Sequence, residues 1–138
     1  MPSSRRSKKQ KMPAKGDCYE AAGKYILNKS ALYMGPDREV EGDVGEASNL
    51  VLVHAEVIGQ GPLEGTTFGH AFVWDKSSDT IIDRANGRNI QLPKILYFTI
   101  GGIDEIGNFY LYTPQQMVEN MIKYKHYGPW DLVTSSGL

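Results

Sequence analysis

FGHAFVWDKSSDTIIDR, residues 68–84, is the part of the sequence on which the fold prediction depends. Its two apolar ends, separated by the polar residues 76–79, are typical of two short strands joined by a turn. If residues 76–79 form the turn, Asp75 faces Thr80, and Phe72 would face the residue three positions beyond Thr80. The segment therefore predicts an antiparallel hairpin with a defined register.

This register brings a histidine close to an aspartate. Side chains alternate along a strand, so His70 and Phe72 share one face with Asp83, which lies opposite Phe72. His70 and Asp83 are then diagonal neighbours, about 7–8 Å apart, which is within reach of a side-chain hydrogen bond. Such an aspartate would fix the histidine tautomer and stabilise its cation. A surface pair of Asp83 with Arg84 is the alternative.

The only cysteine, Cys18, lies at the predicted start of a helix. Asp17 is a suitable N-cap and Glu20 has the spacing of a capping box, and the apolar residues that follow predict a helix ending near Asn28. Free backbone N–H groups and the helix dipole favour a thiolate in the first turn, and the same N–H groups could bind an oxyanion. Alternatively, Cys18 is a small buried hydrophobic residue.

Residues 49–58 predict a central strand, and this strand carries His54. A buried structural histidine is the more common case, but His54 remains an alternative base to His70. Two further strands are expected at residues 95–100 and 108–112. A C-terminal helix is expected to start at Pro114 with Thr113 as its N-cap. The remaining segments are interpreted as loops, at residues 34–48, 59–67 and 85–89, with φ > 0 favoured at Asn86-Gly87.

The charge of the chain is unevenly distributed. Six of the 15 Lys and Arg residues lie within residues 1–16, which contain no acid, so the other residues have nine basic and 16 acidic side chains. Residues 1–15 lack apolar periodicity and predict a disordered basic tail, whereas residues 16–138 predict a single domain. The tail could bind nucleic acid or another polyanion through phosphate contacts, or serve only solubility. Its candidate contact residues are Arg5, Arg6, Lys8, Lys9 and Lys11.

Several classes of protein are disfavoured by the composition. No window approaches the roughly 18 apolar residues of a membrane span, and no apolar segment follows the basic N-terminus as in a secretory signal. One cysteine cannot form an internal disulfide. One Cys and three His without close spacing disfavour a structural zinc site, and no cofactor is expected. The acidic residues 37–46 lack the calcium-loop pattern.

The order of these motifs resembles the papain-like superfold. The shared features are a helix-borne cysteine, the strand Gly69-His70-Ala71-Phe72-Val73, and a following strand with Ile82-Asp83. The most similar groups are the transglutaminase-like branch and the compact bacterial and phage cell-wall peptidases. Residues 52–87 and the ending Tyr127-Gly128-Pro129-Trp130 also look like small uncharacterised phage-encoded proteins. The tryptophan that usually follows the catalytic cysteine is replaced by Tyr19.

The resemblance implies an α+β fold, with an N-terminal helix packed on an antiparallel sheet of about four to six strands and a C-terminal helix. It implies that Cys18 is the nucleophile, His70 the general base and then acid, and Asp83 the orienting group. The backbone N–H of Cys18 and a neighbouring donor would bind the oxyanion, with Tyr19 and Asn86 as oxyanion or supporting residues. Asn86 is also a lesser candidate for the orienting role. The reaction would be acyl transfer through a thioester.

Two functions from different classes follow. The first is a cysteine hydrolase or acyltransferase, such as a thiol protease, amidase or transglutaminase-like enzyme, acting on a peptide or isopeptide bond. In a phage context the substrate would be peptidoglycan or a host protein. The second is a non-catalytic phage virion or host-interaction protein that uses its basic tail on nucleic acid. The expected location is the bacterial host cytoplasm or the virion.

Overall fold

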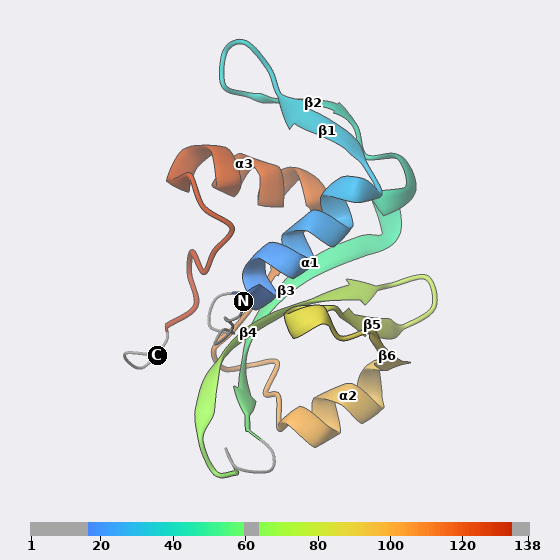
Figure 1. Cartoon of the computed structure of the whole chain (residues 1–138), viewed down its shortest axis with the longest axis vertical. Helices are drawn as coiled ribbons and strands as arrows, with labels where there is room; N and C mark the ends of the chain where they lie inside the picture. The colour runs from blue at the N-terminus through green and yellow to red at the C-terminus, as the bar shows by residue number, and fades with distance from the viewer. Residues whose placement is uncertain (1–16, 60–63, 134–138) are drawn as a thin grey trace, which may run out of the picture.

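A five-stranded antiparallel sheet lies at the centre of the structure, with the strand order β6-β5-β4-β3-β7 (Figure 1). The computed structural model describes residues 17–59 and 64–133. The strands of this sheet are β3 (Leu50–Ile58), β4 (Thr67–Asp75), β5 (Thr80–Asp83), β6 (Ile90–Pro93) and β7 (Phe109–Tyr112). A second, two-stranded sheet consists of β1 (Ala31–Met34) and β2 (Val40–Asp43).

Helices occur at both ends of the described chain and once between the last strands. They are α1 (Asp17–Asn28), α2 (Lys94–Gly101) and α3 (Pro114–Tyr124), together with the 3-10 turns η1 (Gly45–Asn49) and η3 (Ala85–Gly87). The structure confirms the predicted α+β class, with an N-terminal helix, a mainly antiparallel sheet and a C-terminal helix. Helix α1 ends at Asn28, as the sequence predicts, but already includes Asp17, which was expected to precede it as the N-cap.

The hairpin formed by β4 and β5 has the predicted register. Asp75 pairs with Thr80, and Val73 pairs with Ile82. On its other edge, β4 pairs with β3 along its whole length. Because β3 also pairs with β7, it is a central strand, as predicted, and its residues are buried on both faces. This burial explains why its sequence is a continuous apolar run rather than an alternating one.

The two faces of the sheet are covered by different helices. On one face, Leu52, Val73 and Ile82 pack with residues of α1 and α3 in the larger core cluster. On the other face, Val53 and Phe72 pack with Phe98 of α2 in a smaller cluster. Figure 1 shows α1 crossing β3 and β4, with α2 apart from it beyond β5 and β6. A side chain's face on the sheet therefore determines which helix it meets.

The predicted strand at residues 95–100 is wrong, because these residues form most of α2. A short apolar run fits a buried strand and a buried helix equally well, so periodicity could not decide between them. The helix starts directly after Pro93 and ends at Gly101, and the C-cap residue Gly102 adopts a left-handed conformation with φ of 59°. The backbone N–H of Gly102 bonds back to Thr99, as is typical of a helix C-terminus.

The loop expected at residues 34–48 also needs correction. Part of it is the hairpin strand β2, and residues 45–49 form the turn η1. Only Leu32 is buried in the β1–β2 pair, so this hairpin offers no apolar alternation to mark it as sheet. Strand β6 at the sheet edge was not predicted either, since only two of its residues are even partly buried.

The start of α3 agrees with the prediction in detail. Thr113 accepts a hydrogen bond from the backbone N–H of Gln116, and the Gln116 side chain accepts one from the Thr113 backbone. This reciprocal pair is a capping box, and Pro114 follows at the first helical position. It holds Met117 and Val118 of α3 against the sheet.

Replacing Thr113 by Ala is expected to lower the free energy of unfolding by about 1 kcal/mol, because one helix N–H loses its acceptor. Urea denaturation followed by far-UV circular dichroism measures this loss. Thr113→Ser keeps the hydroxyl and is the control, with a midpoint close to that of the unchanged protein. Equal midpoints for the Ala and Ser variants would contradict the assigned role of the hydroxyl.

Candidate active site

Cys18 lies in the first turn of α1, as the sequence predicts, and is 9% exposed. Asp17 is already part of the helix, and its carboxylate accepts a hydrogen bond from the backbone N–H of Asn86. The expectation that Asp17 caps the helix from outside is therefore wrong. Its hydrogen bond instead ties the start of α1 to η3.

His70 and Asp83 form the side-chain hydrogen bond that the register predicts. The distance from His70 Nε2 to Asp83 Oδ2 is 2.9 Å. Both residues are buried, with 8% and 2% exposure, so the contact is shielded from water. They lie on the sheet face of Phe72, which α2 covers. The alternative surface pair of Asp83 with Arg84 is not formed; Arg84 instead lies over the Tyr25 ring.

The thiol of Cys18 reaches His70 even though α1 packs on the other face of the sheet. Pairing between β4 and β5 stops at Val73 and Ile82, while β4 extends back to Thr67. Helix α1 lies against β4 and η3, and Asp17 at its start is hydrogen-bonded to Asn86 of η3. The Cys18 thiol lies close enough to the His70 ring to raise the pKa of that ring. Because Nε2 is bound to Asp83, Nδ1 is the ring nitrogen available to the thiol.

Asp83 is held by two further donors. The backbone N–H of Ala85 donates to Oδ1 at 2.9 Å, and the hydroxyl of Tyr97 donates to Oδ2 at 2.6 Å. The guanidinium of Arg88 lies 3.7 Å from Oδ2. Sequence reasoning missed Tyr97 and Arg88. Tyr97 could not be found while residues 95–100 were assigned to a strand, and only the orientation of α2 brings it to Asp83.

These contacts shift the pKa values of both residues in opposite directions. Burial lowers the pKa of His70, but the hydrogen bonds and negative charges of Asp83 and Cys18 outweigh burial and raise it to about 9. Burial raises the pKa of Asp83, but the bonds from His70, Tyr97 and Ala85 overcome it and lower the pKa to about 2. Near neutral pH, His70 therefore favours the imidazolium and Asp83 the carboxylate.

The alternative base, His54, lies on the opposite face from His70 and is fully buried. Its ring is enclosed by the rings of Tyr19, Tyr112 and Trp130 at centroid distances of 4.9, 5.0 and 5.1 Å. Neither ring nitrogen has a hydrogen-bond partner. Burial lowers its pKa to about 3, against a smaller opposing effect of Asp131. His54 is a neutral core residue.

The two candidate oxyanion donors near Cys18 are placed differently. The side chain of Tyr19 points into the core, where its hydroxyl is buried without a hydrogen-bond partner. Only its backbone N–H belongs to the helix start. Asn86 has the predicted positive φ, 56°, and its backbone N–H is used by Asp17. The catalytic and oxyanion roles of these residues stay predictions.

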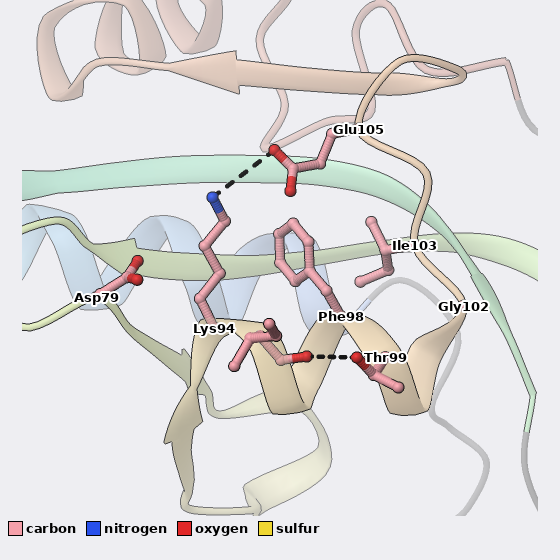
Figure 2. Close-up of a pocket in the computed structure, with 8 residues that line it drawn as sticks. Asp79, Lys94, Phe98, Thr99, Gly102, Ile103 and Glu105 are labelled. Atoms are coloured by element: carbon pink, nitrogen blue, oxygen red, sulfur yellow. Dashed lines mark hydrogen bonds and ion pairs between the residues drawn. The ribbon is translucent and has the colours of Figure 1, made fainter.

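Pockets occur on the α2 side of the sheet, away from Cys18. One of them has a volume of about 520 Å³, and Figure 2 shows the Lys94 ammonium beside Glu105 in it, at 3.7 Å. The same ammonium lies over the Trp74 ring. A second pocket lies near the end of β3. Neither is lined by Cys18, His70 or Asp83. At the thiol, the described residues leave only the 9% exposure noted above.

Other sequence predictions concern metals, membranes and the tail. Nowhere in residues 17–59 and 64–133 do three or more His, Cys, Asp or Glu side chains gather so that they could hold a metal ion. None of the helices in these ranges has the length and apolar character needed to cross a membrane. The basic tail, with Arg5, Arg6, Lys8, Lys9 and Lys11, lies outside the described residues.

In comparisons with known proteins, no family model, curated protein or solved structure matches the chain.

The buried, neutral state of His54 predicts a pH dependence of stability. Its pKa is lower in the folded protein than in the unfolded chain, so below pH 6.5 the unfolded chain binds a proton that the folded protein does not. This lowers stability as the pH falls from about 6.5 toward 3. His54→Phe removes the effect. The unfolding free energy of His54→Phe, measured relative to that of the unchanged protein, should therefore gain roughly 2 kcal/mol when the pH is lowered from 7.5 to 5.

Urea titrations at both pH values measure this gain. His70 acts in the opposite sense over the same range, because its folded pKa is raised, but it is present in both proteins and cancels in the comparison. His126→Gln removes an exposed histidine and is the control, so the effect of His54 is the difference between the two variants. An equal pH response of the His54→Phe and unchanged proteins would show that His54 is not kept neutral by burial.

Proposed function

We propose that this protein is a cysteine-dependent hydrolase or acyltransferase that acts on an amide or isopeptide bond through Cys18, His70 and Asp83. The observation that carries the proposal is the position of the His70 ring, which is hydrogen-bonded to Asp83 and lies close enough to the thiol of a helix-start cysteine for that thiol to raise its pKa. A nucleophile, a base and a group that orients the base are the components of nucleophilic acyl transfer. The resemblance to the papain-like superfold supports the same reaction.

Before substrate binds, His70 Nδ1 holds the proton of the Cys18 thiol, as its raised pKa favours, and in the first step the sulfur of the thiolate attacks the carbonyl carbon of the substrate. The tetrahedral intermediate collapses when the carbon–nitrogen bond breaks. The leaving amine takes the proton from His70, and the acyl group remains on Cys18 as a thioester. The carboxylate of Asp83 stabilises the imidazolium throughout, because it lies 2.9 Å from Nε2.

In the second step, water attacks the thioester carbonyl and gives a proton to His70. The carbon–sulfur bond breaks, the carboxylic acid leaves, and His70 returns the proton to the sulfur. If an amine attacks instead of water, the product is a new amide and the reaction is transamidation. Both outcomes use the same three side chains, and neither needs a cofactor to balance the reaction.

The oxyanion of each tetrahedral intermediate would bind at the start of α1. The first backbone N–H groups of a helix have no partner within the helix, and the helix dipole makes this end positive. The N–H of Cys18 belongs to this group. Since the nucleophile sits on the same turn, the carbonyl oxygen of a bound substrate would lie close to these donors. For the substrate we propose peptidoglycan or a host protein, in line with the phage-type resemblance.

The proposal predicts how Cys18 alkylation by iodoacetamide depends on pH. A free thiol ionises near pH 8.5, so its alkylation falls about tenfold per unit below that pH. In the unchanged protein we expect the rate at pH 6.5 to stay at least ten times above that of His70→Ala, because the imidazolium stabilises the thiolate. His126→Ala is the control and should behave like the unchanged protein.

The shape of the pH profile is the decisive readout, because limited access to Cys18 lowers the rate equally at every pH. Mass spectrometry of the intact chain gives the rate, since the chain has one cysteine. A profile that follows an ordinary thiol and is the same in His70→Ala would end the hydrolase proposal.

Asp83→Asn tests the orienting role. An asparagine amide donating to His70 Nε2 would move the ring proton to Nδ1, where it faces Cys18 and prevents His70 from accepting the thiol proton. We expect alkylation at pH 6.5 to fall by at least tenfold. Because Asp83 also accepts bonds from Tyr97 and Ala85, the melting temperature must be measured alongside. A folded variant with an unchanged alkylation profile would exclude Asp83 from the site.

A non-catalytic virion or host-interaction protein is the second candidate. It is favoured by the 9% exposure of Cys18, which leaves little room for a substrate in the described residues, and by the basic tail. Deleting residues 1–15 separates the two functions. Binding of duplex DNA should disappear with the tail, whereas the reactivity of Cys18 should remain. Strong DNA binding by the shortened chain would contradict the assignment of this role to the tail.

A further inference from the structure

Two donors share one oxygen of Asp83. His70 Nε2 lies 2.9 Å from Oδ2, and the Tyr97 hydroxyl donates to the same Oδ2 at 2.6 Å. The other oxygen, Oδ1, accepts the backbone N–H of Ala85. The two side-chain donors therefore compete for the negative charge of a single atom.

Donors to a common acceptor weaken one another, because each withdraws charge that the other would use. The bond from Tyr97 is stronger when His70 is neutral and weaker when it is an imidazolium, which already neutralises Oδ2. A neighbour that binds better to one protonation state shifts the equilibrium toward that state. The Tyr97 hydroxyl therefore favours release of the proton from His70.

We propose that Tyr97 is a positioning residue that acts on His70 through Asp83, by holding Oδ2 and taking up part of its charge so that the imidazolium can give its proton to the leaving amine. This inference rests on the proposed function. Without Tyr97, Asp83 would bind the imidazolium more tightly. The thiolate would still form, but His70 would be a weaker acid when the carbon–nitrogen bond breaks.

The groups around Asp83 support this assignment. The charged and titratable groups that face it are His70 on β4, Cys18 on α1 beyond His70, Arg88 after η3, and Tyr97 on α2. Arg88 is half-exposed and 3.7 Å away, so solvent screens its effect. Burial, and then the charge and hydrogen bond of Asp83, raise the pKa of Tyr97. Its hydroxyl thus remains a donor at every pH at which the site would work.

The position of Tyr97 is fixed by packing that does not involve its hydroxyl. Its ring lies 4.8 Å from the ring of Phe72, and the next residue, Phe98, anchors α2 in the core. Figure 2 shows Phe98 and Lys94 on the part of α2 that lines the pocket. Tyr97→Phe therefore keeps the ring contact and removes only the donor to Asp83.

The test is an NMR titration of the His70 ring in the full chain carrying Cys18→Ser, with and without Tyr97→Phe. Cys18→Ser removes the thiol, so that the titration midpoint reports the protonation of His70 alone. The His70 ring signals are identified as those missing from the spectrum of His70→Gln. We expect Tyr97→Phe to raise the midpoint by roughly half a unit to one unit. Tyr112→Phe is the matched control, because Tyr112 also donates to an aspartate, Asp131, at 2.6 Å. It should leave the midpoint unchanged.

An unchanged or lowered midpoint in Tyr97→Phe would overturn the proposal. Only the loss of a donor that competes with His70 for Asp83 is expected to make His70 more basic, whereas the loss of a packing contact is not. If Tyr97→Phe does not fold, 3-fluorotyrosine placed at position 97 provides the opposite change. Its more acidic hydroxyl donates more strongly, so the midpoint should fall, and a midpoint that stays or rises contradicts the proposal. Because the titration does not use the thiol, it gives its answer even if Cys18 proves unreactive.

Discussion

The hydrogen bond between His70 and Asp83 places a buried charge pair on one face of the sheet, and several surrounding elements donate hydrogen bonds to its carboxylate. A buried carboxylate is costly unless donors replace the lost water. Three donors reach Asp83 from three different elements: His70 from β4, the Ala85 N–H from the turn after β5, and Tyr97 from α2. The strand register, the η3 turn and the orientation of α2 all meet at this carboxylate.

His54 and His70 show how the two faces of one sheet give one residue type two different chemistries. They lie on the neighbouring strands β3 and β4 and point to opposite faces. His54 is enclosed by three aromatic rings, and burial lowers its pKa to about 3. His70 meets Asp83 and Cys18, and its pKa rises to about 9 despite similar burial. Only a histidine with charged partners can hold a proton in the core for transfer.

The candidate site also brings together segments that are far apart in the sequence. Cys18 at the start of α1 lies close enough to the His70 ring to raise its pKa. The hydrogen bond between Asp17 and the Asn86 N–H fixes this end of the helix to η3. The papain-like resemblance remains a prediction that the comparisons do not test.

The sequence by itself determined the elements and contacts that depend on short-range patterns. The hairpin of β4 and β5 followed from its turn and strand alternation, so the contact of His70 with Asp83 could be predicted. The helix start at Cys18 and the capping box at Thr113 could also be predicted from the sequence, because the interactions that mark a helix end lie within a few residues.

Tertiary structure alone decided the rest. The run 95–100 becomes helix α2 instead of a strand, because an apolar run has no period that separates the two and its packing on the sheet selects the helix. That choice brings the Tyr97 hydroxyl to Asp83. The packing of distant segments also encloses His54 in aromatic rings and brings His70 close to a thiol 52 positions earlier in the chain. Contacts between distant segments depend on how faces pack, and no local pattern records that packing.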